Sequence, residues 1–267
     1  MTVAFGPLVD GGWLAAHLGD VRVVDVRWYL DGRSGRAAYE GGHVPGAVWM
    51  DVDADLADPG STTAGRHPLP APERFGAALG RVGIAAGTPV VAYDDAGGSV
   101  AARLWWLLHV LGEPVAVLDG GLAAYPGELS TMVEAPAPVE REAVPWPAAR
   151  FASADDVAAT SAAVFDARTA ERFAHGLDGV DPRPGHVPGA RSAPWPDNLG
   201  ADGRFRPADR LREHYAAATD GAIAYCGSGV TACHDLLAMT IAGFDDTALY
   251  PGSWSQWGAD ASRPAEV

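Results

Sequence analysis

A single cysteine at the end of an apolar run is the residue of this chain best placed for nucleophilic chemistry. Cys226 follows the run Ala-Ile-Ala-Tyr of residues 222–225 and opens the sequence Cys-Gly-Ser-Gly-Val-Thr-Ala. We expect residues 222–225 to form a strand and a helix to begin near Val230, with a tight loop between them. Successive backbone N–H groups and the positive end of the helix dipole would then face one point. An anion at the Cys226 sulfur would be stabilised there.

Several loop N–H groups are needed for this stabilisation. A free cysteine is only a few per cent thiolate at neutral pH, and making it mostly ionised requires about 2.7 kcal/mol. A helix terminus supplies about 0.3 to 1 kcal/mol, so hydrogen bonds from the loop must provide the rest. Gly227 and Gly229 allow the backbone to close around one atom, which a structural cysteine does not require. We therefore favour a reactive Cys226 over the alternative of a buried structural thiol.

The composition is that of a globular protein and disfavours nucleic acid or a membrane as partner. The 267 residues are 48% hydrophobic and 20% charged, with 33 glycines and 21 prolines. The formal net charge of −15 repels phosphate backbones and anionic lipid surfaces. A small anionic substrate would need a local cluster of arginines to overcome this field.

No targeting signal stands out in the sequence. Residues 1–20 have neither a basic start nor a continuous apolar run, and no segment has the length of a membrane span. Cys226 and Cys233 lie seven residues apart, a poor arrangement for a disulfide framework. We interpret Cys233 as a small core residue, with a resolving thiol for Cys226 as the alternative. We expect reduced thiols and a cytoplasmic location.

The chain contains an internal repeat. The sequence His-Val-Pro-Gly-Ala occurs at residues 43–47 and again at 186–190. Each copy follows a short apolar run that ends in Asp-x-Arg, at residues 23–27 and 164–168. Two copies of one domain are therefore expected.

The repeat predicts two domains of the same α/β class. We place the first at residues 1–134, a proline-rich linker at 135–150, and the second at 151–267. Short apolar runs alternate with helical stretches, such as residues 100–111 and 231–242, in each half. This alternation predicts a parallel sheet flanked by helices, with ligands at the carboxyl ends of the strands.

Only the second copy carries a nucleophile. Asp94 stands in the first copy where Cys226 stands in the second, and two acids follow the strand there. We expect one active centre per chain, with the first copy as a non-catalytic domain.

Together these motifs resemble the two-domain rhodanese-like sulfurtransferases over nearly the whole chain. The resemblance rests on the paired Asp-x-Arg and His-Val-Pro-Gly-Ala motifs, the Cys226 loop in the second copy alone, and Gly-Ser-Trp at residues 252–254. It implies two tandem rhodanese-like domains. The loop is similar to that of the 3-mercaptopyruvate sulfurtransferase branch, because thiosulfate-preferring members typically have a basic pair where this chain has Gly227 and Ser228.

The resemblance also implies a reaction. Cys226 would take sulfur from 3-mercaptopyruvate as a persulfide and pass it to cyanide or to a thiol acceptor such as thioredoxin, without a metal or organic cofactor. Backbone donors can hold the anionic terminal sulfur. The main alternative is a thiosulfate:cyanide sulfurtransferase, or rhodanese. We expect a monomer with a small-molecule sulfur donor.

By the same resemblance, three residues would handle the proton that the departing enolate needs. These are Ser228 in the loop, His67 in the sequence Gly-Arg-His-Pro-Leu-Pro, and Asp53. The alternative for His67 is an ordinary histidine in a solvent-facing loop.

The substrate carboxylate and keto group require cationic partners, and a bidentate arginine suits a planar α-keto acid. The matching positions are Arg172 and Arg183, although the stretch that separates Arg172 from the second repeat motif is shorter than in the family. The remaining residues expected to line the substrate site are Gly227, Gly229, Val230 and Thr231.

Two further classes of protein are considered. Cysteine phosphatases and arsenate reductases of similar topology have Cys-x5-Arg, whereas this chain has Ala232 at that position, so a phosphate would lack its clamp. A non-catalytic binding module is disfavoured by the intact Cys226 loop. His43 and His186 occur in both copies, and we interpret them, with the Asp-x-Arg pairs, as structural.

Overall fold

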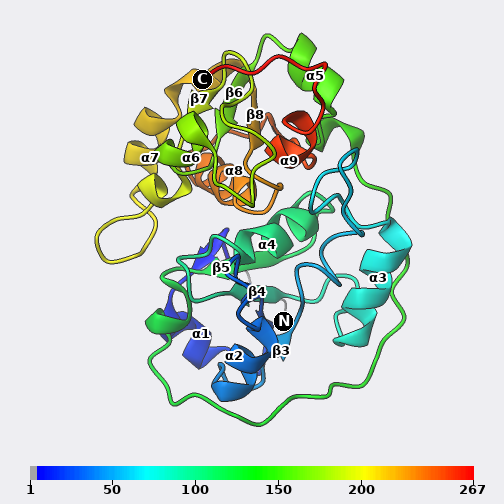
Figure 1. The fold of residues 1–267 in the computed structure, drawn as a ribbon. Coiled ribbons are helices and arrows are strands. Elements are labelled where there is room, and N and C mark those ends of the chain that lie inside the picture. Colours follow the sequence, from blue (N-terminus) through cyan, green and yellow to red (C-terminus); the bar gives the residue numbers. More distant parts are fainter. Residues whose placement is uncertain (1–4) are drawn as a thin grey trace. The chain divides into compact units, whose positions relative to one another are not determined.

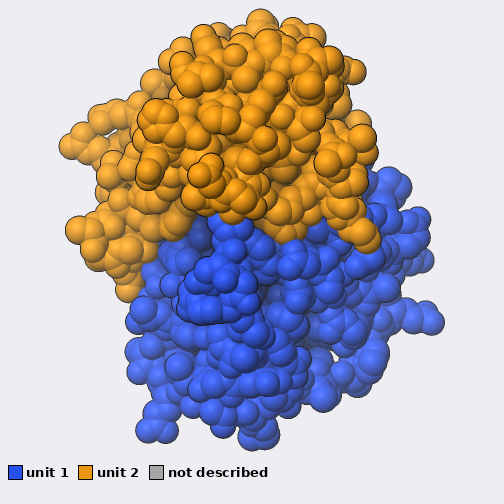
Figure 2. All heavy atoms as spheres, in the orientation of Figure 1, with its two compact units in different colours: residues 1–58, 70–146 blue, residues 59–69, 147–267 orange. Residues whose placement is uncertain are grey.

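Residues 5–267 are described in a computed structural model, in which the chain forms two compact units (Figures 1 and 2). Of the described residues, unit 1 comprises 5–58 and 70–146, and unit 2 comprises 59–69 and 147–267. Each unit has its own sheet and its own apolar core. The short segment 59–69, which comes from the first half of the sequence, is therefore part of the unit that contains Cys226.

Unit 1 contains a five-stranded parallel sheet in the order β1-β5-β4-β2-β3. Its elements are β1 (Leu8–Val9), α1 (Gly11–Ala16), β2 (Arg22–Asp25), α2 (Gly35–Gly41), β3 (Val48–Trp49), α3 (Pro72–Arg81), β4 (Val90–Tyr93), α4 (Ala101–His109), β5 (Val115–Leu118) and the 3-10 turn η1 (Gly121–Ala124). All four residues of β4 and of β5 are buried, as expected of central strands of a parallel sheet.

Unit 2 contains a four-stranded parallel sheet in the order β7-β6-β8-β9. Its elements are η2 (Ala148–Arg150), α5 (Ala154–Ala159), β6 (Ala163–Asp166), α6 (Ala170–His175), β7 (Arg191–Ser192), η3 (Trp195–Asn198), α7 (Ala208–His214), η4 (Ala216–Asp220), β8 (Ala222–Tyr225), α8 (Ala232–Ile241), β9 (Thr247–Leu249) and α9 (Ser253–Trp257). The predicted α/β class, with two parallel sheets flanked by helices, is confirmed.

The two sheets repeat the same pairing, as the sequence repeat indicates. Asp25 of β2 pairs in register with Tyr93 of β4, and Asp166 of β6 pairs with Tyr225 of β8. Each central strand therefore delivers the residue that follows its tyrosine, Asp94 or Cys226, to the carboxyl edge of its own sheet.

Residues 131–147 contain neither helix nor strand, as Figure 1 shows, yet residues 131–146 belong to unit 1. The Val139 N–H donates to the carbonyl of Gly80 at 3.0 Å, and the buried Arg141 forms an ion pair with Glu113 at 2.6 Å. Much of the predicted linker is thus bound to the surface of unit 1. The domain boundaries at residues 134 and 151 stay a prediction.

Along residues 5–267, none of the helices has both the length and the apolar character needed to cross a bilayer.

Candidate active site

Cys226 lies at the carboxyl end of β8, in a loop of residues 226–231 that we call the Cys226 loop. Its side chain is buried, and the N–H of Gly229 donates to its sulfur over 3.1 Å. The first turn of α9 fixes the backbone on the other side, because the Cys226 N–H donates to Ser253 Oγ at 3.1 Å and the Trp254 N–H donates to the Cys226 carbonyl at 3.0 Å. The sulfur is therefore held at one place with at least one backbone donor facing it.

Different structural constraints apply at the two glycines of the Cys226 loop, Gly229 and Gly227. Gly229 has a φ of +80°, and a Cβ there would lie 2.7 Å from the carbonyl oxygen of Pro251, so no other residue fits without moving the backbone. Gly227 lies instead beside two cationic side chains. A Cβ at Gly227 would be 2.7 Å from Arg172 Nη2 and 3.2 Å from Arg66 Nη2.

His67 and Ser228 form a buried hydrogen-bonded pair with 2.8 Å between Nδ1 and Oγ. The alternative of a solvent-facing loop histidine is thus wrong, since the exposed fraction of His67 is only 2%. Segment 59–69 reaches Ser228 because Gly65, with a φ of +90°, packs directly on Gly252: a Cβ at Gly65 would be 2.6 Å from the Gly252 carbonyl oxygen. Two small residues let these backbones approach.

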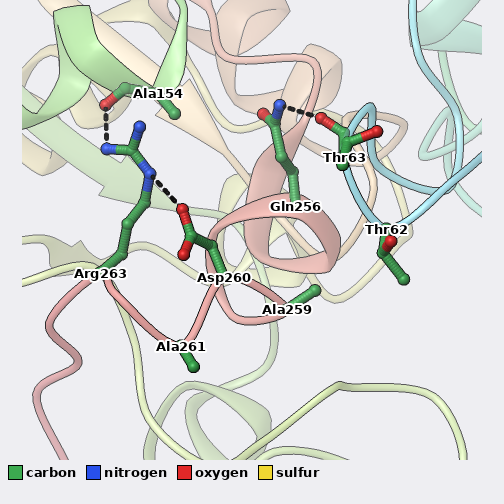
Figure 3. A pocket seen from close by; sticks show the side chains of 8 residues that line it. All are labelled: Thr62, Thr63, Ala154, Gln256, Ala259, Asp260, Ala261 and Arg263. Carbon is green, nitrogen blue, oxygen red and sulfur yellow. Dashed lines mark hydrogen bonds and ion pairs between the residues drawn. The ribbon is translucent and has the colours of Figure 1, made fainter.

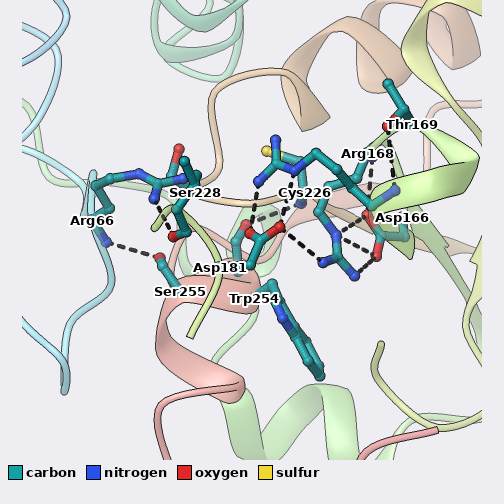
Figure 4. A network of polar contacts seen from close by, with 12 residues as sticks. Arg66, Asp166, Arg168, Thr169, Asp181, Cys226, Ser228, Trp254 and Ser255 are labelled. Carbon is teal, nitrogen blue, oxygen red and sulfur yellow. Dashed lines mark hydrogen bonds and ion pairs between the residues drawn. The ribbon is translucent and has the colours of Figure 1, made fainter. Parts of the chain in front are cut away.

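Arg172, on α6, approaches the same loop and is held by the buried carboxylate of Asp181, which Figure 4 labels. Its Nε donates to Asp181 Oδ2 at 3.0 Å and its Nη2 to Asp181 Oδ1 at 2.7 Å. Asp181 Oδ2 also lies 3.7 Å from Nη1 of the buried Arg168. The bidentate pair fixes the plane of the Arg172 guanidinium next to Gly227.

Sequence reasoning did not identify Arg66 as a site residue. Its backbone N–H donates to Ser255 Oγ at 2.9 Å (Figure 4), and its Nη1 donates to the carbonyl of Val180 at 2.9 Å. The signal available was its position directly before His67. The direction of the Arg66 side chain depends on the path of segment 59–69 in the folded protein, and the position of Arg66 in the sequence does not reveal that path.

The Arg183 side chain lies against the C-terminal segment of unit 2. Its Nη2 donates to the carbonyl of Arg263 at 2.7 Å, and its guanidinium carbon is 5.8 Å from the ring of Trp254. The structure therefore holds Arg183 against the C-terminal segment and does not bring it to the Cys226 loop with Arg172.

The other predicted site residues are placed as follows. Val230 is buried in the Cys226 loop, and Thr231 is the half-buried residue directly before α8. Asp53 belongs to unit 1, where its Oδ2 accepts a hydrogen bond from Trp28 Nε1 at 2.8 Å. Its role beside His67 stays a prediction.

Comparison with known proteins identifies the family. The model of the rhodanese-like domain matches residues 10–128 and 152–260. The chain belongs to the rhodanese-like domain family. A Pseudomonas aeruginosa protein provisionally named a 3-mercaptopyruvate sulfurtransferase is 41% identical over 96% of both chains. A Mycobacterium tuberculosis protein, SseB, provisionally named a thiosulfate sulfurtransferase, is 37% identical over 91% of this chain and 90% of its own.

A solved structure supports the same family assignment. SseA from Escherichia coli, described as a 3-mercaptopyruvate sulfotransferase with the rhodanese fold, superimposes with a TM-score of 0.81. It is 30% identical, over 94% of this chain and 99% of its own. The family model matches two rhodanese-like domains, and relatives named as enzymes of sulfur transfer match nearly the full length of the chain. The chain is therefore a two-domain sulfurtransferase.

In the first rhodanese-like domain, Asp94 occupies the position of Cys226 and fills its own loop. Its Oδ1 accepts hydrogen bonds from the N–H groups of Ala96 and Gly98, and its Oδ2 from those of Val100 and Ala101, all between 2.8 and 2.9 Å. Burial raises the pKa of the Asp94 carboxyl, and the four N–H donors oppose that rise. The loop between β4 and α4 is thus an anion cradle occupied by the chain's own carboxylate.

The histidines of the two rhodanese repeat motifs are structural, as predicted. His43 is buried, stacks on Tyr39 and contacts the carbonyls of Tyr39 and Met132 at 2.7 and 3.0 Å. His186 stacks on Phe173 at 3.6 Å between ring centroids. Both rings pack against their own unit and touch no part of the Cys226 loop among the contacts of residues 5–267.

The predicted Asp-x-Arg ion pairs and the structural role of Cys233 are also confirmed. Arg27 contacts Asp25 at 2.6 Å and Arg168 contacts Asp166 at 2.7 Å, and all four side chains are buried. Cys233 is fully buried, and its thiol donates to the carbonyl of Gly229 at 3.4 Å. It supports the Cys226 loop from the first turn of α8.

Unit 2 also contains a surface pocket of about 360 Å³, shown in Figure 3. It is lined by Thr62, Thr63, Ala154, Gln256, Ala259, Asp260, Ala261 and Arg263. None of these residues belongs to the Cys226 loop, so the pocket is separate from the thiol.

Proposed function

We propose that this two-domain sulfurtransferase uses 3-mercaptopyruvate as its sulfur donor and Cys226 as its nucleophile. The observation that carries the proposal is the contact between the Gly229 N–H and the Cys226 sulfur, next to a pair of arginines and a hydrogen-bonded histidine and serine. A backbone donor stabilises an anionic sulfur, and two guanidinium groups suit the carboxylate of an α-keto acid.

The Cys226 thiolate attacks the thiol sulfur of the donor. A sulfur–sulfur bond forms, the carbon–sulfur bond of the donor breaks, and its electron pair leaves with the carbon as the enolate of pyruvate. Protonation of this enolate gives pyruvate and leaves Cys226 as a persulfide. The Gly229 N–H, which faces the Cys226 sulfur before the reaction, then faces the anionic persulfide.

The proton for the enolate comes through Ser228. Its hydroxyl is hydrogen-bonded to His67 at 2.8 Å, both groups are buried, and Ser228 is two residues after the reacting cysteine in the chain. A histidine that polarises a hydroxyl can deliver a proton as the leaving group develops charge. Arg172 holds the carboxylate, because its guanidinium lies beside Gly227 in an orientation fixed by Asp181.

A thiol acceptor completes the cycle. Its thiolate attacks the outer sulfur of the persulfide, takes that sulfur as a new persulfide and returns Cys226 to the thiolate. Cys226 and Cys233 are not joined in a disulfide, which supports a reducing compartment such as the cytoplasm and an acceptor of the thioredoxin kind. We also propose that the protein is a monomer.

The test compares two donors. Steady-state rates with 3-mercaptopyruvate and with thiosulfate are measured on the wild-type protein, and the persulfide is located by the mass gain of one sulfur on the Cys226 peptide. We expect a higher kcat/KM with 3-mercaptopyruvate, no turnover for Cys226→Ser, and retained turnover for the matched variant Cys233→Ala. A clear preference for thiosulfate, as the name of the M. tuberculosis relative suggests for that protein, would overturn the donor assignment.

A further inference from the structure

We infer that Gln256, on α9, is a positioning residue for His67. Its side chain holds a turn of residues 61–65, which we call the Thr63 turn, and this turn sets where His67 meets Ser228. The inference deepens the proposed function and rests on it for the part that His67 plays in the reaction. The contacts that support it all lie within unit 2 and do not depend on the identity of the donor.

The Gln256 amide joins α9 to the Thr63 turn. Its Nε2 donates to the Thr63 carbonyl at 2.5 Å, across 193 residues of sequence, as Figure 3 shows. Its Oε1 accepts a hydrogen bond from the Tyr250 hydroxyl at 2.9 Å. Burial raises the pKa of the Tyr250 phenol, so this hydroxyl stays a donor and fixes which end of the amide faces the turn.

The Gln256 side chain folds back over Gly252, directly before α9. A Cβ at Gly252 would be 1.8 Å from Gln256 Oε1, so any larger residue at position 252 would displace the amide. Gly252 also contacts the Thr63 turn, because a Cβ at Gly65 would be 2.6 Å from the Gly252 carbonyl oxygen. Gly252 therefore lets the glutamine and the turn meet.

The Thr63 turn is closed by its own hydrogen bonds. The Ser61 N–H donates to the Gly65 carbonyl at 2.9 Å, and the Gly65 N–H donates to the Ser61 carbonyl at 2.8 Å. Ser61 Oγ also accepts from the Ala64 N–H at 3.0 Å. Because these bonds fix the backbone of the turn, a contact at Thr63 constrains the direction in which the chain leaves it at Gly65.

His67 comes two residues after the Thr63 turn. Between them, the Arg66 backbone N–H donates to Ser255 Oγ at 2.9 Å, again on α9. His67 Nδ1 then lies 2.8 Å from Ser228 Oγ, and both side chains are buried. A hydrogen bond tolerates a change of only a few tenths of an ångström, so a shift of the turn by ~1 Å would break this contact.

The competing explanation is that Gln256 contributes only to the stability of unit 2. A purely structural contact would slow the enzyme to the same extent with and without His67. A positioning contact acts through His67, so its loss has no further effect on the rate once the imidazole is removed.

The first part of the test is kinetic. kcat with 3-mercaptopyruvate is measured for Gln256→Met and Gln256→Glu, each alone and combined with His67→Gln. Methionine has the length of glutamine without its donor. An ionised glutamate keeps the acceptor for Tyr250 and cannot donate to the Thr63 carbonyl.

The second part observes the imidazole itself, in a proton–nitrogen correlation spectrum of protein with labelled histidine. The His67 signals are assigned by their loss in His67→Gln, and Ser228→Ala gives the position of the Nδ1 signal without the hydrogen bond. The control in both experiments is Asp260→Asn. This residue lines the same pocket as Gln256, and its contacts are with Ser262 and Arg263.

We expect both Gln256 variants to lower kcat with 3-mercaptopyruvate by about 3- to 10-fold and to move the His67 Nδ1 signal toward its position in Ser228→Ala. The loss stays below that of His67→Gln because Ser255 still holds the segment. Neither variant should lower kcat further in the His67→Gln background, and Asp260→Asn should match the wild type in both experiments.

An unchanged Nδ1 signal in both Gln256 variants, or an equal loss of kcat in the two backgrounds, would overturn the inference. Failure of the proposed function gives a different result: His67→Gln then keeps the wild-type rate, or the wild type does not use 3-mercaptopyruvate. The Nδ1 signal decides the role of Gln256 in either case.

Discussion

His67 Nδ1 lies 2.8 Å from Ser228 Oγ, although 161 residues separate the two in the chain. The contact exists because segment 59–69 is part of the compact unit that contains Cys226. This hydrogen bond joins Ser228, two residues after the proposed nucleophile Cys226, to the imidazole ring of His67.

Replacing His67 by Gln should lower kcat with 3-mercaptopyruvate by about 100-fold, because the enolate loses its proton donor. Turnover with thiosulfate should fall much less, since sulfite leaves as a stable anion. The double variant with Ser228→Ala should be no slower than the worse single variant, because the two groups act as one unit. Steady-state kinetics of the three variants measures this, and losses that multiply would contradict the coupling.

Substitution of the two loop glycines should separate stability from donor binding. Gly229→Ala should destabilise the fold by more than about 1 kcal/mol, because a Cβ would meet the Pro251 carbonyl at 2.7 Å and φ is +80°. The Cβ in Gly227→Ala would meet side-chain atoms of Arg172 and Arg66 and no backbone atom, so we expect it to displace these guanidinium groups and leave the backbone in place. We expect the variant to keep its unfolding midpoint and to raise KM for 3-mercaptopyruvate. Denaturation and steady-state kinetics check both, and a normal KM for Gly227→Ala would argue against donor binding at this point.

Asp94→Ala should destabilise the protein by about 2 kcal/mol or more, because four backbone N–H groups lose their acceptor. Asp95→Ala is the matched control, because the carboxylate of Asp95 is exposed and accepts a hydrogen bond from the Tyr29 hydroxyl. The urea midpoints of the two variants are compared with that of the wild type. Equal small shifts would show that the cradle does not need its carboxylate.

Asp235, on α8 behind the Cys226 loop, should make stability depend on pH. Burial raises the pKa of this carboxyl well above its ordinary value, and Asn198 Nδ2 donates to its Oδ1 at 2.9 Å. Its contribution to stability is therefore fully present below the unfolded-state pKa near 4 and is lost as the pH rises through the higher folded-state pKa. Asp235→Asn carries no charge and lacks this loss.

The expected result is that Asp235→Asn gains stability relative to the wild type at pH 8 compared with pH 5. Urea denaturation of both proteins at the two pH values measures the difference. Asp245→Asn, which changes an exposed acid between α8 and β9, is the control for a general effect of net charge. An identical difference at both pH values would show that Asp235 is ionised to the same extent in both states.

The sequence by itself determined the architecture and the loop that holds Cys226, the proposed nucleophile. The apolar runs before Tyr93 and Tyr225 predict the two central strands, the repeated motifs predict two similar domains, and the glycines after Cys226 predict the tight loop. These features are local: strand propensity, turn geometry and helix start depend on residues within a few positions of one another. The structure confirms the strands and the loop for that reason.

Only the tertiary structure decided which distant side chains meet at Cys226. Segment 59–69 carries Arg66 and His67 into unit 2, whereas Arg183, much closer to Cys226 in sequence, points to the Arg263 carbonyl. Such contacts depend on the path of the whole chain and on where long, flexible guanidinium groups find acceptors. No local pattern encodes that information, because the energy that selects it comes from packing between segments far apart in the sequence.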